Sequence, residues 1–196
     1  MFYTMSMNLG SIWSNKKSSH VINKLQNSVV SAPPVNISVI SVNISAQRSR
    51  AYWGTPTWIL FHTVAAKTDI NFYNANYALV WTFIKNVCHN LPCPYCKKHA
   101  MEYVNKISLH EISTKEKLKA VLYKFHNIAN GHGGSAHAPV SVLDKYNKTN
   151  TKQIFDLFEA RFFKSFIGTR QFNDWTKNKF KQEFYAFFNV IRTHIS

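Results

Sequence analysis

The feature that most constrains this chain is a helical period of apolar residues between Trp53 and about residue 131. Apolar side chains recur there at steps of three and four residues in four successive segments, which is the spacing that gives an α-helix one buried face. The loops between these segments are brief. Amphipathic helices joined by short loops pack side by side, so the sequence predicts an all-α fold built on a four-helix bundle.

Prolines indicate where two of these helices begin. Thr55 is the expected N-cap of the first helix, with Pro56 in its first turn, where proline is tolerated. Cys93 and Pro94 repeat this arrangement, so we expect the third helix to begin there. One face of the first helix then carries Trp58, Phe61, His62 and Ala65, and one side of the third carries Cys96, His99, Ala100 and Tyr103.

The other two helices are indicated by their period and by a capping signal. The second is expected within residues 74–91, with Cys88 on its apolar side as a buried thiol. The fourth is expected to open on the capping box formed by Ser113 and Glu116. It should end at the sequence Asn-Gly-His-Gly-Gly, residues 130–134, because glycine commonly ends helices.

The N-terminal part of the chain has a different composition. Residues 1–50 contain five basic residues and no acidic one, and they are rich in Ser and Asn. Such a composition predicts a basic, flexible segment. Residues 35–45 alternate apolar and polar side chains, and this pattern indicates one short strand.

The C-terminal part is predicted to be helical. Residues 141–148 indicate an additional short helix, and residues 151–167 and 172–194 indicate two longer helices rich in aromatic residues. We expect most of these aromatic side chains in a core, namely Phe155, Phe158, Phe162, Phe166, Trp175, Phe184 and Phe188. The predicted organisation is an N-terminal segment (1–50), a helical domain (51–150) and a helical C-terminal extension (151–196).

Composition narrows the class of protein. The chain has 24 Lys and Arg against 9 Asp and Glu, a formal charge of +15, which attracts nucleic acid, an acidic membrane surface, an acidic partner or a phosphate-bearing cofactor alike. Three cysteines among 196 residues do not make a secreted disulfide scaffold. No apolar stretch reaches the roughly 20 residues that a membrane span needs, so we expect a soluble protein.

Cys93 and Cys96 form a Cys-x-x-Cys motif followed by His99, and this spacing fits three kinds of site. A structural zinc site would need a fourth ligand from Cys88, His89 or a more distant histidine, and the usual second pair of ligands is missing. A structural disulfide between residues three apart would close a very small loop and restrain little of the unfolded chain.

A redox site has a direct physical rationale. Cys93 would stand at a helix N-terminus, where the unpaired amides and the helix dipole stabilise a thiolate. Lys97, Lys98 and the nearby histidine act in the same direction. A dithiol of this kind can take electrons from another dithiol by disulfide exchange. The predicted helices on both sides exclude a thioredoxin-like fold for this chain, so the electrons must leave by another route.

Three separated motifs stand out over about 80 residues: "WGTPTWILFH" at 53–62, "CPYCKKHAMEY" at 93–103 and "FHNIAN" at 125–130. In sequence and in order they resemble the motifs of the Erv/ALR family of FAD-linked sulfhydryl oxidases. The chain is most similar to the compact members found in large DNA viruses. The resemblance implies an all-α FAD-binding bundle over residues 51–150 and a role in forming disulfide bonds.

The resemblance also implies roles for individual residues. Cys96 would face the isoalloxazine ring of FAD, and Cys93 would exchange disulfides with an incoming thiol. The implied electron acceptor is dioxygen, which gives hydrogen peroxide, and the implied substrates are protein thiols, with thioredoxin-like partners among them. No metal is implied, and nucleic acid is then not an expected partner. The residues expected to bind FAD are Trp53, Gly54, Trp58, His62, His99, His126, Asn127 and Asn130.

The chain departs from the family pattern in three respects. Arg50 lies close to the first Trp but out of the usual register, and "GHGGSAHAP" replaces the basic segment that commonly follows the last Asn. No second, shuttle Cys-x-x-Cys is present, so substrate thiols are expected to reach Cys93 directly. The alternative to an oxidase is a basic, zinc-stabilised helical module that binds nucleic acid, with Cys93, Cys96 and His99 as ligands. A homodimer is also expected, because the aromatic helix faces exceed what one small bundle can bury.

Overall fold

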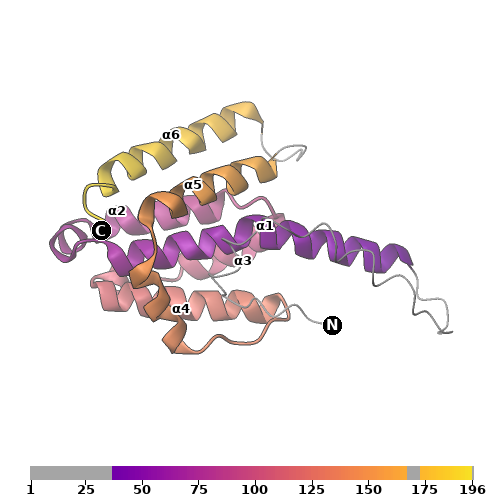
Figure 1. Ribbon diagram of the computed structural model, residues 1–196, viewed down its shortest axis with the longest axis horizontal. Coiled ribbons are helices and arrows are strands. Elements are labelled where there is room, and N and C mark those ends of the chain that lie inside the picture. The colour runs from indigo at the N-terminus through magenta and orange to yellow at the C-terminus, as the bar shows by residue number, and fades with distance from the viewer. Residues whose placement is uncertain (1–36, 167–172, 196) are drawn as a thin grey trace.

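The computed structural model describes the backbone of residues 37–166 and 173–195, and side chains from residue 50 onward within those ranges. Figure 1 shows the described residues as packed helices, and the regular elements among them are α-helices and 3₁₀ helices. The described residues pair in β fashion at a single bridge, between Thr68 and Ile195. The predicted all-α fold is confirmed.

Four helices form the central bundle, and their ends differ in part from the prediction. α1 spans Ile37–Lys67, α2 Ile70–His89, α3 Pro94–Val104 and α4 Lys115–His132, with the 3₁₀ helix η3 at Leu109–Ile112.

α1 begins far upstream of the predicted cap at Thr55, so that prediction is wrong. Pro56 lies inside the helix, and the Thr57 hydroxyl donates to the Trp53 carbonyl at 2.7 Å. Trp53 is buried and packs edge-on against Phe162 of the C-terminal part, so this tertiary contact extends the buried face of α1 upstream of the proline. Helix formation there outweighs the local cost of an internal proline.

The predicted strand at residues 35–45 is also wrong, because residues 37–45 belong to α1. A strand needs a neighbouring strand for its backbone hydrogen bonds, whereas a helix satisfies them within itself. The described chain offers this segment no strand to pair with. α1 therefore crosses residue 50, the boundary predicted from composition, and the rest of the predicted flexible segment, residues 1–36, lies outside the described residues.

α2 begins at Ile70, upstream of the predicted residue 74, and α4 is capped by another residue than expected. Asp69 caps α2 by accepting from the Phe72 N–H at 2.9 Å, and Asn76 has non-helical torsion angles that mark a kink. Thr114 caps α4 by accepting from the Lys117 N–H. The predicted box at Ser113 and Glu116 is wrong, because Thr114 and not Ser113 is the N-cap residue of α4. A capping box of the same Ser-x-x-Glu pattern forms at Ser108 and Glu111 in η3.

The C-terminal extension packs along the bundle. It consists of the 3₁₀ helix η4 at Val140–Lys148, α5 at Thr151–Phe162, the 3₁₀ helix η5 at Phe163–Phe166 and α6 at Asp174–Ile191. In Figure 1, α5 lies beside α1, and α6 covers α5 and contacts α2. The predicted short helix and the two predicted longer helices are therefore present.

Most of the aromatic side chains predicted for a core are buried, and one is not. Phe155, Phe158, Phe162, Phe166 and Phe184 are buried, and Phe188 packs against them. Trp175 is 71% exposed, with the Lys179 ammonium 5.4 Å from its ring centroid, so its place in a core was wrongly predicted. The aromatic faces that motivated a homodimer are thus covered within the chain, and the homodimer stays a prediction without that support.

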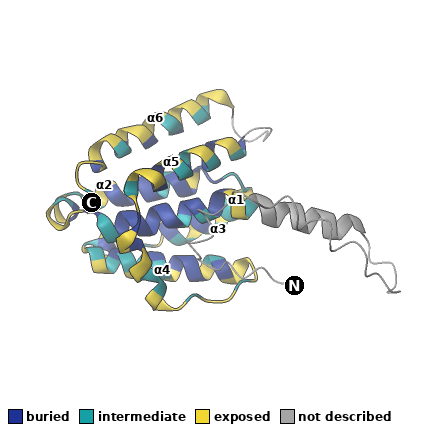
Figure 2. Cartoon of the chain, in the orientation of Figure 1, coloured by how far each residue is buried: buried dark blue, intermediate teal, exposed yellow. Residues whose placement is uncertain are grey.

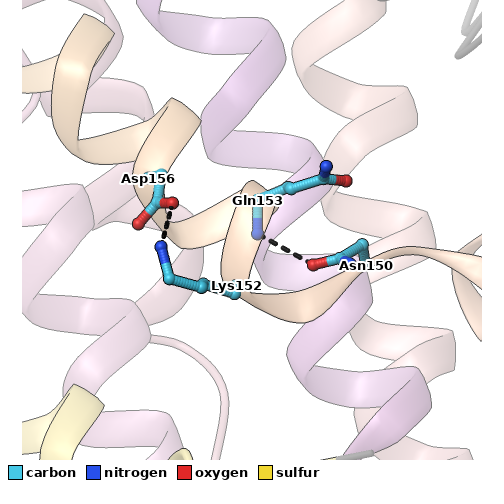
Figure 3. A network of polar contacts seen from close by, with 4 residues as sticks. All are labelled: Asn150, Lys152, Gln153 and Asp156. Carbon is cyan, nitrogen blue, oxygen red and sulfur yellow. Dashed lines mark hydrogen bonds and ion pairs between the residues drawn. The ribbon is translucent and has the colours of Figure 1, made fainter.

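Polar contacts lie at both ends of the C-terminal extension. Figure 3 shows the start of α5, where Asn150 accepts from the Gln153 N–H at 3.1 Å and Lys152 pairs with Asp156 at 2.7 Å. At the other end, the Asp69 N–H donates to the His194 carbonyl at 2.7 Å.

Figure 2 shows where the side chains are buried. They follow the inner faces of α1, α2 and α5, while the outer face of α6 is exposed. Within the described ranges, none of the helices combines the length and apolar character that crossing a bilayer requires.

Candidate active site

The dithiol stands at the N-terminus of α3. Cys93 is the N-cap residue of this helix, and its Sγ accepts a hydrogen bond from the Cys96 backbone N–H at 3.2 Å. Pro94 follows in the first turn, where a residue without an N–H costs the helix no hydrogen bond. Both thiols are free and partly exposed. The positive end of the α3 dipole therefore acts on Cys93.

The two thiols have opposite electrostatic properties. Hydrogen bonding from the Cys96 side chain, then from the Cys96 backbone N–H, together with the charge of Arg50, lowers the pKa of Cys93 to about 6 in spite of partial burial. The same side-chain hydrogen bond, followed by burial, raises the pKa of Cys96. Because one thiol stabilises the other as a thiolate, the pair at neutral pH holds its first negative charge on Cys93.

Cys88 differs from both. It lies in α2 with 1% of its surface exposed, and burial alone raises the pKa of its thiol. A protonated, enclosed thiol is a poor nucleophile. The prediction of a buried residue at this position is confirmed.

A cavity of about 190 Å³ lies beside the dithiol, between α1, the C-terminal end of α2, α3 and α4. Cys96 and the buried Cys88 line it, and Cys93 does not. Of the residues predicted to bind a cofactor, the structure brings five to this cavity, namely Trp53, Gly54, Trp58, His99 and Asn130. His62, His126 and Asn127 are buried and do not line it.

The two buried histidines support the wall of the cavity. The Trp58 ring stacks on the His126 ring with centroids 4.1 Å apart, and His126 Nδ1 is 3.0 Å from His62 Nε2. Tyr146 of η4 stacks on the other side of His62 at 4.8 Å. Burial lowers the pKa of His62 to about 4, and burial with the nearby His62 lowers the pKa of His126 to about 3. Both rings are therefore neutral at pH 7 and fix the Trp58 ring from behind.

The asparagines of α4 hold the loop that follows it. Asn127 Oδ1 accepts from the Ala138 N–H at 2.9 Å, so its side chain is engaged with the loop and not with the cavity. The Asn130 carbonyl accepts from the Ser135 N–H at 2.8 Å. Gly134 has a φ of 72°, a conformation that favours glycine, and this turn brings the chain back over the end of α4.

The mouth of the cavity contains residues that sequence reasoning did not assign to the site. Tyr95, between the two cysteines, lines the cavity with 56% of its surface exposed and packs edge-on against His99. His99 also stacks on His132 at 4.4 Å, and His132 lines the cavity from α4. Arg50 lines it from α1. Tyr95 could have been assigned to the site from the sequence, because it lies inside the Cys-x-x-Cys motif. His132 could not, because its position depends on how α3 and α4 pack.

The lining of the cavity suits a flat ring and a phosphate, as in the flavin implied by the resemblance, and its volume of about 190 Å³ accommodates part of such a molecule. A Cβ built on Gly54 would meet nothing within 4 Å, so the α1 backbone borders open space at this point of the wall. Rings from Trp53, Trp58 and Phe125 provide faces and edges for stacking. Arg50 provides a positive charge of the kind that binds phosphate.

The zinc alternative lacks a ligand set in the described part of the chain. No group of three or more His, Cys, Asp or Glu side chains is gathered there closely enough to hold a metal ion. His99 instead packs between Tyr95 and His132, and its Nδ1 is 3.5 Å from a Glu102 carboxylate oxygen. Cys93, Cys96 and His99 are therefore not gathered into a ligand set in the described part of the chain.

A helical bundle with an activated dithiol beside an aromatic cavity defines a protein of the dithiol redox class. Comparison with known proteins gives a family match: residues 55–149 match the Erv1/Alr family. The resemblance inferred from the three motifs is confirmed.

Three viral relatives are similar to the chain. A protein of Frog virus 3 is 25% identical over 114 residues, which are 52% of this chain and 76% of the relative. A protein of Invertebrate iridescent virus 6 is 27% identical over 99 residues, 47% of this chain and 89% of the relative. A protein of Invertebrate iridescent virus 3 is 29% identical over 79 residues, 40% of this chain and 53% of the relative. Each is named as an FAD-linked sulfhydryl oxidase. No solved structure matches the chain at a significant level.

Proposed function

We propose that this protein is an FAD-linked sulfhydryl oxidase that forms disulfide bonds in protein thiols. The observation that carries the proposal is the placement of the dithiol: Cys96 lines an aromatic cavity of α1, α3 and α4, and Cys93, three residues before it, does not. One thiol is thus directed to a site that fits a flavin, while the other is available outside that site. The family match and the names of the three viral relatives support the same activity.

Cys93 is the residue that exchanges disulfides with the substrate. It is partly exposed, it lies at the N-terminus of α3, and its pKa is lowered to about 6. A thiol of low pKa is a good leaving group, so a mixed disulfide between Cys93 and a substrate resolves readily when a second substrate thiol attacks it. Arg50 contributes to this property, because its charge favours the thiolate forms of both cysteines.

The cavity residues hold FAD. Trp53 and Trp58 offer ring faces, Gly54 leaves space beside α1, and Asn130 offers a polar edge from α4. His62 and His126 act from behind the wall by fixing the orientation of Trp58, and Asn127 acts by holding the loop over α4. FAD, when bound, takes two electrons from the reduced dithiol and passes them to dioxygen, which yields hydrogen peroxide. Cys96 is the thiol placed to deliver these electrons.

The test combines the colour of the protein with its turnover. We expect the purified full chain to be yellow with bound FAD, and to oxidise dithiothreitol with one dioxygen consumed and one hydrogen peroxide formed per disulfide. Cys93→Ser and Cys96→Ser should each abolish turnover, because disulfide exchange needs both sulfurs. Cys88→Ser should keep most of the activity at a small cost in stability, because Cys88 is buried and protonated.

Two outcomes would contradict the proposal. One is a colourless protein that binds zinc stoichiometrically and oxidises no thiol, which would favour the zinc-stabilised module. The other is a Cys93→Ser variant with the turnover of the unchanged chain. A Cys88→Ser variant as inactive as Cys93→Ser would instead show that Cys88 is a working redox residue.

A further inference from the structure

We propose that Cys93 accepts thiols that lie in acidic segments of partner proteins, with the Lys97 and Lys98 side chains as the groups that recognise the acidic residues. This inference rests on the proposed oxidase function and adds the substrate class to it. It is carried by the charges around the dithiol, by their position outside the cavity and by the small number of carboxylates in the neighbouring segments.

The positive groups nearest the dithiol along α3 lie outside the cavity. Lys97 and Lys98 follow Cys96 directly, and neither lines the cavity. Lys98 is exposed, and Lys97 is partly exposed. Burial and, after it, the charge of Lys97 lower the pKa of His89, so the Lys97 charge lies near the end of α2 beside the turn that leads to Cys93. These charges are therefore available to a molecule that approaches Cys93 from solvent.

The helices that carry the site contain almost no negative charge, and the carboxylate that α6 brings to α2, Glu183, accepts from Asn86 Nδ2 at 2.6 Å. Residues 70–101, which form α2 and the first part of α3, contain no Asp or Glu, and neither do residues 37–68 of α1 or residues 117–143 around the end of α4. The carboxylate of α3, Glu102, is next to His99 at 3.5 Å. A low-dielectric surface that carries one sign of charge raises the local concentration of ligands of the opposite sign. A thiol flanked by Glu or Asp is thus favoured over one flanked by Lys.

The cofactor accounts for only part of this positive charge. Arg50 lines the cavity and is positioned for a phosphate of FAD, whereas Lys97 and Lys98 lie outside it. Tyr95 adds an apolar contact at the mouth, because it is more than half exposed beside Cys93. The surface formed by Tyr95, Lys97 and Lys98 suits an acidic segment that also offers an apolar side chain next to its cysteine.

The proposed exchange of disulfides at Cys93 takes place in two steps. A substrate thiolate attacks Cys93 Sγ of the oxidised pair, the Cys93–Cys96 bond breaks, and Cys96 leaves as a thiolate. The second substrate thiolate attacks the substrate sulfur of the mixed disulfide and releases the Cys93 thiolate. The substrate gains one disulfide and loses two electrons and two protons; the electrons reside on the dithiol until FAD and then dioxygen accept them.

The experiment compares two synthetic dithiol peptides that are identical except for their flanks, which are Glu in one and Lys in the other. With the full-length holoprotein at low salt, we expect kcat/KM from oxygen consumption to be at least about tenfold higher for the Glu peptide, the lower end of electrostatic steering effects. The preference should shrink as salt is raised, because exposed charges are screened. Dithiothreitol is the neutral reference substrate.

Charge variants test the assignment to this surface. In Lys97→Glu combined with Lys98→Glu, the ratio of the two kcat/KM values should invert. Lys119→Glu combined with Lys148→Glu changes the net charge equally at residues that do not line the cavity, and it should leave the ratio unchanged. Lys98→Gln, at an exposed position, is a milder variant that should reduce the ratio if the double variant fails to fold by circular dichroism.

A second measurement does not depend on flavin. Each peptide is prepared as a single-cysteine mixed disulfide with thionitrobenzoate and offered to the reduced Cys96→Ser protein, and the release of thionitrobenzoate reports attack by Cys93. The Glu peptide should react faster. Equal rates for both peptides in both measurements, with dithiothreitol still oxidised, would overturn the acidic-substrate inference alone. Failure to oxidise any thiol would overturn the proposed oxidase function, while the Cys93 exchange rates would still decide the inference.

Discussion

The bundle and the C-terminal extension both use aromatic side chains, but with different results. In the extension, Phe158 stacks on Phe162 at 4.5 Å and on Phe184 at 5.2 Å, and all three are buried. In the bundle, Trp58 stacks on His126 while also lining an open cavity. Aromatic content alone therefore does not separate a core from a binding site. A ring belongs to the candidate binding site when part of its surface lines a cavity that sulfur and polar groups also line.

Among the variants that test the difference between core rings and cavity rings, the largest effect on stability is expected at Phe158. Phe158→Ala leaves a cavity in the ring cluster of the extension, and we expect it to lower the free energy of unfolding by about 3–5 kcal/mol. Flavin content per folded molecule should stay the same, because Phe158 does not line the cavity. Denaturant unfolding and the visible spectrum measure the two quantities.

Trp175→Ala is the matched control on α6. Trp175 is exposed, so its loss should change the free energy of unfolding by no more than about 0.5 kcal/mol. If Trp175→Ala lowered the free energy of unfolding as much as Phe158→Ala, Trp175 would have to be buried against another surface in solution.

A second expected effect is a loss of stability in acid that originates behind the cavity wall. The pKa of His62 is about 4 and that of His126 about 3, against 6.5 for an ordinary histidine. Below pH 6.5 the unfolded chain binds protons that the folded chain does not. The stability contributed by neutral His62 is therefore fully present above pH 6.5 and is lost as the pH falls toward 4, a loss on the order of 3 kcal/mol.

Urea unfolding at neutral pH and at a pH about 2 units lower measures this dependence. His62→Gln should reduce this dependence without abolishing it, because His126 stays buried with a lowered pKa, and His110→Gln, at an exposed position, should leave it unchanged. An identical pH dependence in His62→Gln and in the unchanged chain would show that the buried pair is not the source. In that case the interpretation that two neutral histidines hold the Trp58 ring would be wrong.

The smallest of the three effects concerns the cavity wall itself. His126→Ala combined with Asn130→Ala should weaken FAD retention by about tenfold, which corresponds to about 1.4 kcal/mol. The double variant removes the ring behind Trp58 and a polar side chain of the wall, while the helices should persist by circular dichroism. Full flavin occupancy after dialysis would remove both residues from the proposed site.

Asn150→Ala provides the matched change in the extension. Asn150 caps α5 outside the cavity, so its loss should cost about 1 kcal/mol of stability and leave FAD retention unchanged. The two variants together separate damage to the site from damage to the fold.

Much of the candidate site could be predicted from the sequence because its motifs are local. The position of Cys93 at a helix N-terminus follows from Pro94 and the period after it, and both are read within one turn. The burial of Cys88 follows from its place on an apolar helix face. The start of α1 could not be predicted in the same way, because the local signal at Thr55 and Pro56 is outweighed by the contact of Trp53 with Phe162, more than a hundred residues away.

The sequence by itself determined the helices, the activated dithiol and the set of rings and amides near it, because periods and spacings act over a few residues. Only the tertiary structure decided which of those residues face the cavity and which support it. His62 and His126 lie behind Trp58, Asn127 holds a loop, and His132 reaches the mouth. These differences depend on how α1, α3 and α4 pack against one another. No local pattern records that packing, because burial is a property of contacts between segments far apart in the chain.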